Sequence, residues 1–175
     1  MSDAGDPPRV ALIAALGIAI ATVAAVLAIA TAGQHRRQPI SVAAVPAPHA
    51  ADSVCTTLLD ALPQHLGDHP RVELARPEAG VAAWSAGGDE PLVLRCGLDR
   101  PADFVVGSPI QGINQVQWFQ ARAGDRSTWF TVDRPVYVAL TLPAGSGPAP
   151  IQQLSDLVAR IVPAAPINPA APDQP

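Results

Sequence analysis

Residues 91–98, Pro-Leu-Val-Leu-Arg-Cys-Gly-Leu, are the stretch from which the fold of this 175-residue chain is best worked out. Every second residue of the stretch is apolar, which is the period of a strand with one buried face: Leu92, Leu94, Cys96 and Leu98. The pattern therefore predicts a strand whose cysteine points into the core, while Arg95 points to the opposite face.

The other cysteine of the chain lies on a predicted helix upstream of this strand. Asp52 or Ser53 can cap the helix, and Pro63 ends it. Its apolar residues recur at the spacing of one helical face: Cys55, Leu58, Leu59 and Leu62. If this face packs on the strand, the two sulfur atoms meet in the core, and the pattern supports a Cys55–Cys96 disulfide. Two buried free thiols are the alternative, which a reducing compartment would favour.

Three further runs downstream predict strands, at 115–121, 128–132 and 136–142. Residues 123–126, Ala-Gly-Asp-Arg, have the length and the glycine of a hairpin turn. A second amphipathic helix is expected over 151–162. This order predicts an α+β domain in which an antiparallel sheet is backed by two helices.

The N-terminal region predicts a transmembrane helix over 10–33, because no charged residue lies between Arg9 and His35. A helix of this length would extend about 36 Å, against roughly 30 Å of bilayer hydrocarbon. We expect a signal anchor in the lipid bilayer, with residues 1–9 in the cytoplasm and the C-terminal domain outside. Cleavage after Ala32 is the alternative, since Ala-Thr-Ala at 30–32 fits a signal-peptidase site.

Composition divides the rest of the chain into three parts. Residues 34–50 are rich in proline and alanine and predict an extended linker. The extracytoplasmic domain is expected over 51–162. In residues 163–175 a proline recurs at every third position, and we predict a disordered tail there, although the repeat also suits a polyproline ligand.

Charge excludes several classes of function. The net charge is −4, and the 11 basic residues are all arginine. Arg36–Arg37 is the only adjacent basic pair, so we predict no nucleic-acid partner. The absence of lysine excludes mechanisms that depend on one, such as Schiff-base formation.

We find no motif that predicts a catalytic, cofactor-binding or metal-binding residue. The sequence contains no G-x-S-x-G, G-x-G-x-x-G or P-loop pattern. His65 and His69, with Asp68, have a spacing that suits a metal on a helix, but prolines and a glycine around them predict a loop. Asp89–Glu90 is expected to be a solvated turn and not an acid–base pair.

Aromatic residues offer the best candidates for recognition. Trp84, Trp118 and Trp129 either pack in the core or line a surface that binds a partner. Arg95 and Tyr137 fall on strand faces opposite the core set. We therefore predict a recognition surface, for an unknown envelope protein or ligand, formed by Trp84, Trp118, Arg95 and Tyr137.

Three stretches taken together resemble a known family: residues 55–63 around the first cysteine, Ala83–Trp84 with 91–97, and 116–118 with 134–138. The family consists of short actinobacterial proteins of unknown function, each with an N-terminal membrane segment and an exported domain. The resemblance implies export and the pairing of the two cysteines, and it brings no catalytic residues. Ser85-Ala86-Gly87-Gly88 departs from the tight Trp-Gly turn of the family.

The most direct interpretation is a single-pass membrane protein whose extracytoplasmic domain is a non-enzymatic binding module of the cell envelope. One alternative is an enzyme or accessory factor of cell-wall metabolism with an unconventional site. A purely structural envelope protein and a cleaved secreted protein are the others. An enzyme should have a pocket with convergent titratable groups, whereas a binding module should have an apolar groove.

Overall fold

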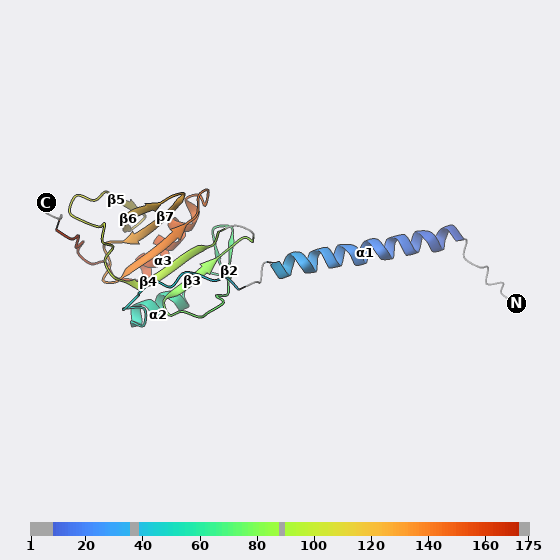
Figure 1. Ribbon diagram of the computed structural model, residues 1–175, viewed down its shortest axis with the longest axis horizontal. Coiled ribbons are helices and arrows are strands. Elements are labelled where there is room, and N and C mark those ends of the chain that lie inside the picture. Colours follow the sequence, from blue (N-terminus) through green and yellow to red (C-terminus); the bar gives the residue numbers. More distant parts are fainter. Residues whose placement is uncertain (1–8, 36–38, 88–89, 172–175) are drawn as a thin grey trace. The chain divides into compact units, whose positions relative to one another are not determined.

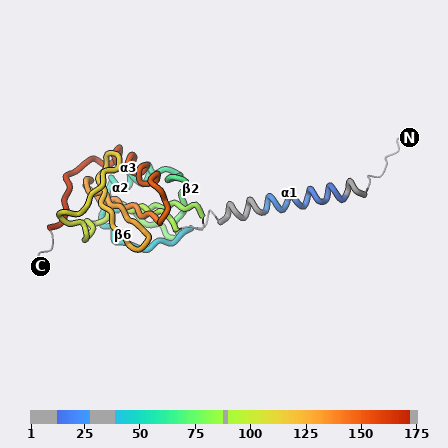
Figure 2. Tube along the Cα trace, turned by 90° about the horizontal axis from the view of Figure 1, so that it is seen from above, coloured from blue at the N-terminus to red at the C-terminus, as the bar shows by residue number. Residues whose placement is uncertain are grey.

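The computed structural model describes residues 9–35, 39–87 and 90–171, and within 9–35 it describes the side chains of 13–27. The predicted cytoplasmic tail, apart from Arg9, lies outside the described residues. The chain divides into two units, Met1–Gln38 and Pro39–Pro175 (Figures 1 and 2). Each unit is treated by itself.

The first unit contains α1 (Arg9–His35). Its described side chains, 13–27, are exposed. Within the part of the chain that is described, we find no helix that combines the length and the apolar character needed to cross a membrane. The predicted transmembrane helix over 10–33 and the predicted single-pass membrane location are therefore wrong.

The second unit is built on an antiparallel sheet of eight strands in the order β1-β2-β3-β4-β8-β7-β6-β5 (Figure 1). The predicted fold class is corrected accordingly: the described residues of the whole chain form an eight-stranded antiparallel sheet and three helices, of which α1 belongs to the first unit. The strands are β1 (His65–Leu66), β2 (His69–Val72), β3 (Val81–Trp84), β4 (Leu92–Leu98), β5 (Ile110–Ile113), β6 (Val116–Ala123), β7 (Arg126–Thr131) and β8 (Tyr137–Leu142).

Two four-stranded meanders meet at the centre of this sheet. The first runs from the edge strand β1 inward to β4, and the second runs from the edge strand β5 inward to β8. β4 and β8 join them, with Leu94 opposite Leu140 and Cys96 opposite Val138. The sequence pattern locates the strands β4, β6, β7 and β8. It misses β1, β2, β3 and β5, which are two to four residues long.

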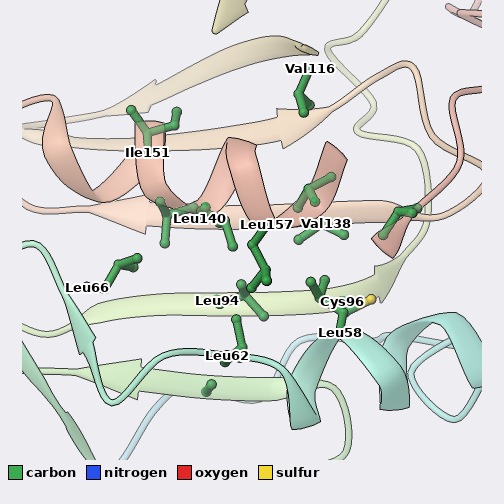
Figure 3. Close-up of a cluster of buried hydrophobic side chains, with 14 of the residues drawn as sticks. Leu58, Leu62, Leu66, Leu94, Cys96, Val116, Val138, Leu140, Ile151 and Leu157 are labelled. Atoms are coloured by element: carbon green, nitrogen blue, oxygen red, sulfur yellow. The ribbon is translucent and has the colours of Figure 1, made fainter. Parts of the chain in front are cut away.

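The helices α2 (Ser53–Asp60) and α3 (Ala149–Ile161) contribute to the main core on one face of the sheet, which we call the helix face. Leu58 of α2 and Leu157 of α3 belong to the same buried cluster as Leu94 and Leu140. Figure 3 shows Leu157 directed from α3 toward Leu94, and Leu58 beside Cys96. Apolar side chains at helical spacing thus meet apolar side chains at strand spacing.

The disulfide between Cys55 of α2 and Cys96 of β4 is present. The Cα atoms are 5.6 Å apart, and neither residue has measurable exposure. The prediction of this pairing is confirmed, and the alternative of two free thiols is excluded. The bond ties the first helix of the domain to a central strand of its sheet.

The opposite face of the sheet, here called the second face, is covered at one end by residues 39–45. The backbone N–H of Ile40 donates to the carbonyl of Glu73 at 2.9 Å, and the N–H of Ala75 donates to the carbonyl of Ile40 at 2.8 Å. Ile40 and Val42 pack on a small buried cluster that includes Val93. Residues 39–50, expected as a linker, therefore belong to the fold.

The other end of the second face is covered by the loop after β4 and by the C-terminal segment, which lie side by side (Figures 1 and 2). The N–H of Ala170 donates to the carbonyl of Phe104 at 3.0 Å, and the N–H of Val106 donates to the carbonyl of Ala170 at 2.9 Å. Phe104 is buried against Phe119. Residues 163–171 are thus part of the domain, whereas the rest of the predicted tail lies outside the described residues.

Gly97 marks an irregularity in β4, where the pairing with β8 shifts register. Its φ is +88°, and a Cβ built there would lie 2.3 Å from the backbone nitrogen of Ala50. The carbonyl of Gly97 accepts a hydrogen bond from the N–H of His49 at 3.0 Å. Only glycine combines this backbone conformation with this close approach.

Candidate functional site

Three hollows meet around the loop 143–148, which connects β8 to α3. The loop turns at Gly145 and Gly147, whose φ angles are +80° and +68°. Within it, the Ser146 hydroxyl donates to the carbonyl of Pro143 at 2.8 Å. Pro143 borders all three hollows, so this loop is the common wall of the candidate site.

The hollow on the helix face measures about 400 Å³, and we call it the Trp129 groove. Its apolar lining comes from Trp129 of β7, Ile113 of β5, Leu142 of β8 and Ile151 of α3. Polar groups at its margin come from Gln111, Asp125, Ser127 and Ser146. Ligand sites of this size are typically apolar with a few polar groups, so the composition suits binding.

Trp129 is distinguished from the other two tryptophans by its exposure. It is half-buried, whereas Trp84 and Trp118 have no measurable exposure. The indole nitrogen of Trp84 donates to the carbonyl of Pro63 at 3.1 Å, which fixes that ring inside the core. Neither Trp84 nor Trp118 is at a surface, and the recognition surface drawn from the sequence does not include them.

The edge strand β5 forms the outer wall of the Trp129 groove through Gln111 and Ile113. Ile113 and Val116 close a two-residue turn, so Gly112 and Gln117 form the next pair of the ladder. The carbonyl of Gln117 accepts its hydrogen bond from Val132, on the β7 side. The Gly112–Gln117 pair is therefore a non-hydrogen-bonded pair of the β5–β6 ladder, because the backbone groups of Gln117 face β7. The N–H and C=O of Gly112 consequently point away from β6, toward the open edge of the sheet.

The turn after β5 is held against α3 by one side chain. Asn114 has a φ of +52°, a conformation that asparagine tolerates better than most residues. Its amide donates to Asp156 Oδ1 at 2.6 Å and to the carbonyl of Gln152 at 3.2 Å. The position of β5 beside the groove is therefore fixed from the helix side.

The hollow on the second face measures about 180 Å³, and we call it the Arg95 hollow. Arg95 lies on this face, as the strand pattern predicts, and its Nη2 donates to the carbonyl of Ala43 at 2.7 Å. Glu90 and Arg126 also line it and form a two-pronged ion pair, with Arg126 Nε 2.7 Å from Glu90 Oε2. The hydrogen bond from Arg126 is the main cause that lowers the pKa of Glu90.

Tyr137, the other predicted surface residue, lies away from these hollows. It packs at the margin of the buried cluster formed by Phe104, Phe119 and Val132. Burial raises the pKa of its hydroxyl above the ordinary value, and the charge of Arg100 opposes this shift. Tyr137 lies two residues from Ala139, the partner of Arg95, so both residues are on the second face, as the strand pattern predicts. Tyr137 does not line the Arg95 hollow, however.

The third hollow, of about 250 Å³, lies between the other two and borders His69, Glu90, Asp125 and Ser146. Among the described residues, no three His, Cys, Asp or Glu side chains are close enough together to hold a metal ion. Asp89, one half of the predicted acidic turn, lies outside the described residues. The described member, Glu90, is held by Arg126.

Comparison with known proteins gives a family for this domain. Residues 16–167 match the family described as "Protein of unknown function (DUF3515)". This chain belongs to the DUF3515 family. No curated protein and no solved structure matches the chain significantly.

The sequence distinguishes poorly between the residues of this site. Trp129 is one of three tryptophans that it offers, and alternation along β7 places Trp129 toward the helices. Trp129 is half-buried beside the loop 143–148 and Ile151, so its exposure depends on the position at which α3 begins. That position depends on packing across the DUF3515 domain, and no local signal in residues 126–131 carries it.

Proposed function

We propose that this domain is a non-enzymatic binding module that takes an uncharged, extended peptide segment along the edge of β5. One apolar side chain of the peptide would occupy the Trp129 groove. The observation that carries the proposal is the half-buried Trp129 at the floor of a groove bordered by an open edge strand. A hollow of about 430 Å³ beside β2 and β3 differs from this groove, because its lining includes three charged side chains, Arg71, Glu73 and Glu78.

The chemistry of the β5 edge supports this proposal. Edge strands in native proteins are usually protected by charged residues, proline or bulges. Residues 110–117, Ile-Gln-Gly-Ile-Asn-Gln-Val-Gln, contain neither a charge nor a proline. The outward N–H and C=O of Gly112 are suited to main-chain pairing with a further strand.

The direction of the side chains also fits. A peptide that adds to β5 continues the pleat of the sheet, so its alternate side chains point to the helix face. Gln111 and Ile113 lie on that face and line the groove. An apolar side chain at such a position would contact Ile113 and extend toward Trp129, as aromatic anchors do in other interfaces.

The composition of the groove favours binding over catalysis. Among its described lining residues, Asp125 is the one carboxylate, and it lies in the exposed turn between β6 and β7. Acid–base chemistry generally needs two titratable groups held in different environments. The Ser146 hydroxyl is already engaged with the carbonyl of Pro143.

The experiment is a selection of random eight-residue peptides displayed on phage against the domain. Selected peptides should be neutral and apolar at alternate positions. Trp129→Ala and Gly112→Pro should each weaken their binding at least tenfold, because the first removes the floor of the groove and the second removes the outward N–H.

Gly112→Ala is the matched control for the edge. A Cβ at Gly112 would lie 3.5 Å from the Gln117 side chain, which is an ordinary contact, and the N–H remains. This variant should bind selected peptides as the parent does. The folding of Gly112→Pro is checked by urea unfolding, which should occur at the same urea concentration as for the parent. If this folded variant binds the selected peptides with undiminished affinity, the proposal is contradicted.

We also propose that the cysteine pair and the Trp84…Leu-Arg-Cys-Gly block are shared by the actinobacterial proteins that this sequence resembles. The disulfide and the fully buried Trp84 lie at the centre of the main core, where substitution is costly. Alignment of further family members would test this, and frequent loss of one cysteine alone would contradict it.

A further inference from the structure

Arg95 lies at the centre of the second face and has few partners for a residue with five N–H donors. It is opposite Val81 of β3 and Ala139 of β8, so strands flank it on both sides. Its Nη2 donates to the carbonyl of Ala43, and its buried Nε has no hydrogen-bond partner among the described residues. A half-buried guanidinium with an unpartnered N–H is stabilised by any additional hydrogen-bond acceptor.

The charge on Arg95 is also poorly balanced. Burial is the main cause that lowers the pKa of Arg95, and the field of Glu78 opposes that shift without forming a contact ion pair. Arg126, the second guanidinium at the hollow, is committed to Glu90. The lining of the hollow therefore carries two arginines against one carboxylate, and the unbalanced positive charge is that of Arg95.

A hydroxyl donor and apolar walls complete the Arg95 hollow. Thr141 lines it, and its Oγ1 is 3.0 Å from Oγ1 of Thr128. When the Thr128 hydroxyl donates to that of Thr141, the Thr141 hydroxyl keeps its own hydrogen free for a further acceptor in the hollow. Val42 and Val93 form part of the wall, so the hollow is a cationic group set in partly apolar surroundings.

We propose that the Arg95 hollow binds a small carboxylate carried on a short aliphatic group. The guanidinium and the threonine pair would hold the two carboxylate oxygens, and Val42 and Val93 would contact the hydrocarbon part. The volume of about 180 Å³ corresponds to roughly six water molecules, which suits a molecule of this size. A phosphate dianion fits less well, because the one unbalanced positive charge of the lining leaves its second negative charge without a partner.

The test uses the full chain labelled with ¹⁵N and follows the Arg95 Nε–H signal during titration with sodium butyrate, sodium acetate, sodium phosphate and sodium chloride at constant ionic strength. Butyrate should give a saturable shift and bind at least threefold more tightly than acetate, because its longer chain contacts the apolar wall. Chloride should give no saturable shift, and phosphate should bind more weakly than butyrate.

Two substitutions separate a specific site from general attraction to arginine. Arg95→Lys should weaken butyrate binding at least tenfold, because lysine keeps the charge but loses the planar fork. Arg122→Lys is the matched control, since Arg122 is exposed on β6 and bonds to Gln120, and this variant should bind butyrate as the parent does. If Arg95→Lys fails to fold, Thr141→Val replaces it, with an expected loss of at least threefold.

Several results would overturn the inference. An equal shift with chloride would mean that no specific site exists. Phosphate binding as tight as butyrate binding would show that the ligand class is wrong. Undiminished butyrate binding in a folded Arg95→Lys or Thr141→Val variant would show that Arg95 or the threonine pair does not hold the anion.

Discussion

The indole N–H of Trp118 on β6 donates a hydrogen bond of 2.9 Å to the hydroxyl of Ser155 on α3, and both residues are completely buried. The Ser155 hydroxyl donates in turn to the carbonyl of Ile151 at 2.7 Å. These two hydrogen bonds satisfy the indole N–H, the polar group that a tryptophan brings into a core. They also fix the position of α3 over the sheet, and therefore the position at which the helix begins beside the Trp129 groove.

Ser155→Ala should lower the free energy of unfolding by about 1–3 kcal/mol, because it leaves the Trp118 N–H buried without a partner. Urea unfolding measures this loss. In a Trp118→Phe background, which contains no indole N–H, the same substitution should cost clearly less. Equal costs in the two backgrounds would show that the hydrogen bond contributes nothing to stability.

Replacing both Cys55 and Cys96 by alanine should lower the free energy of unfolding by about 4 kcal/mol. The bond closes a loop of sequence separation 41, and the chain-entropy model gives a cost of this size when such a constraint is removed from the unfolded state. Urea unfolding of the parent in the presence of a reductant should shift toward that of the variant. Identical unfolding with and without reductant would contradict the prediction.

Gly97→Ala should destabilise the domain by about 3 kcal/mol or more, because the new Cβ would collide with the backbone of Ala50. Gly124→Ala is a matched control with a similar backbone conformation. Gly124 has a φ of +64° and open space around it, so that variant should lose only about 1 kcal/mol. Thermal unfolding of the two variants separates the effect of the collision from that of the backbone angle.

Glu90 should titrate below the ordinary pKa of a glutamate, chiefly because Arg126 donates a hydrogen bond to it. Since the pKa is lower in the folded state, the ion pair favours folding above the unfolded pKa, and this contribution disappears as the pH falls through the folded pKa. NMR titration of the Glu90 carboxyl carbon measures the shift. Arg126→Met should return the pKa toward its ordinary value, and an unchanged pKa in that variant would refute the assigned cause.

The parts of the fold that the sequence predicts are those with a strong local period. The apolar alternation of 92–98 and 137–142 identifies β4 and β8, and the three- and four-residue spacing identifies α2 and α3. β3, in contrast, is buried at all four positions, so it has no alternation to detect. β2 contains Pro70, which argues against a strand unless the partners are known.

The candidate site is less predictable because it depends on long-range packing. Alternation along β4 correctly places Arg95 on the face opposite the main core. Alternation along β6 places Trp118 on the same face as Val116, and both residues are buried in the core, so the prediction that Trp118 belongs to a recognition surface is wrong. The groove beside Trp129 forms only when β5, β7 and the start of α3 come together, and these elements are far apart in the sequence.

The meeting of two meanders at β4 and β8 has a consequence for the synthesis of this chain. Leu94 pairs with Leu140, so β4 leaves the ribosome long before its partner does. Until residue 142 has emerged, β4 is an apolar strand with one unpaired edge, which is the kind of nascent segment that aggregates or recruits chaperones. The second meander, by contrast, is built from local hairpins and can form as soon as it is made.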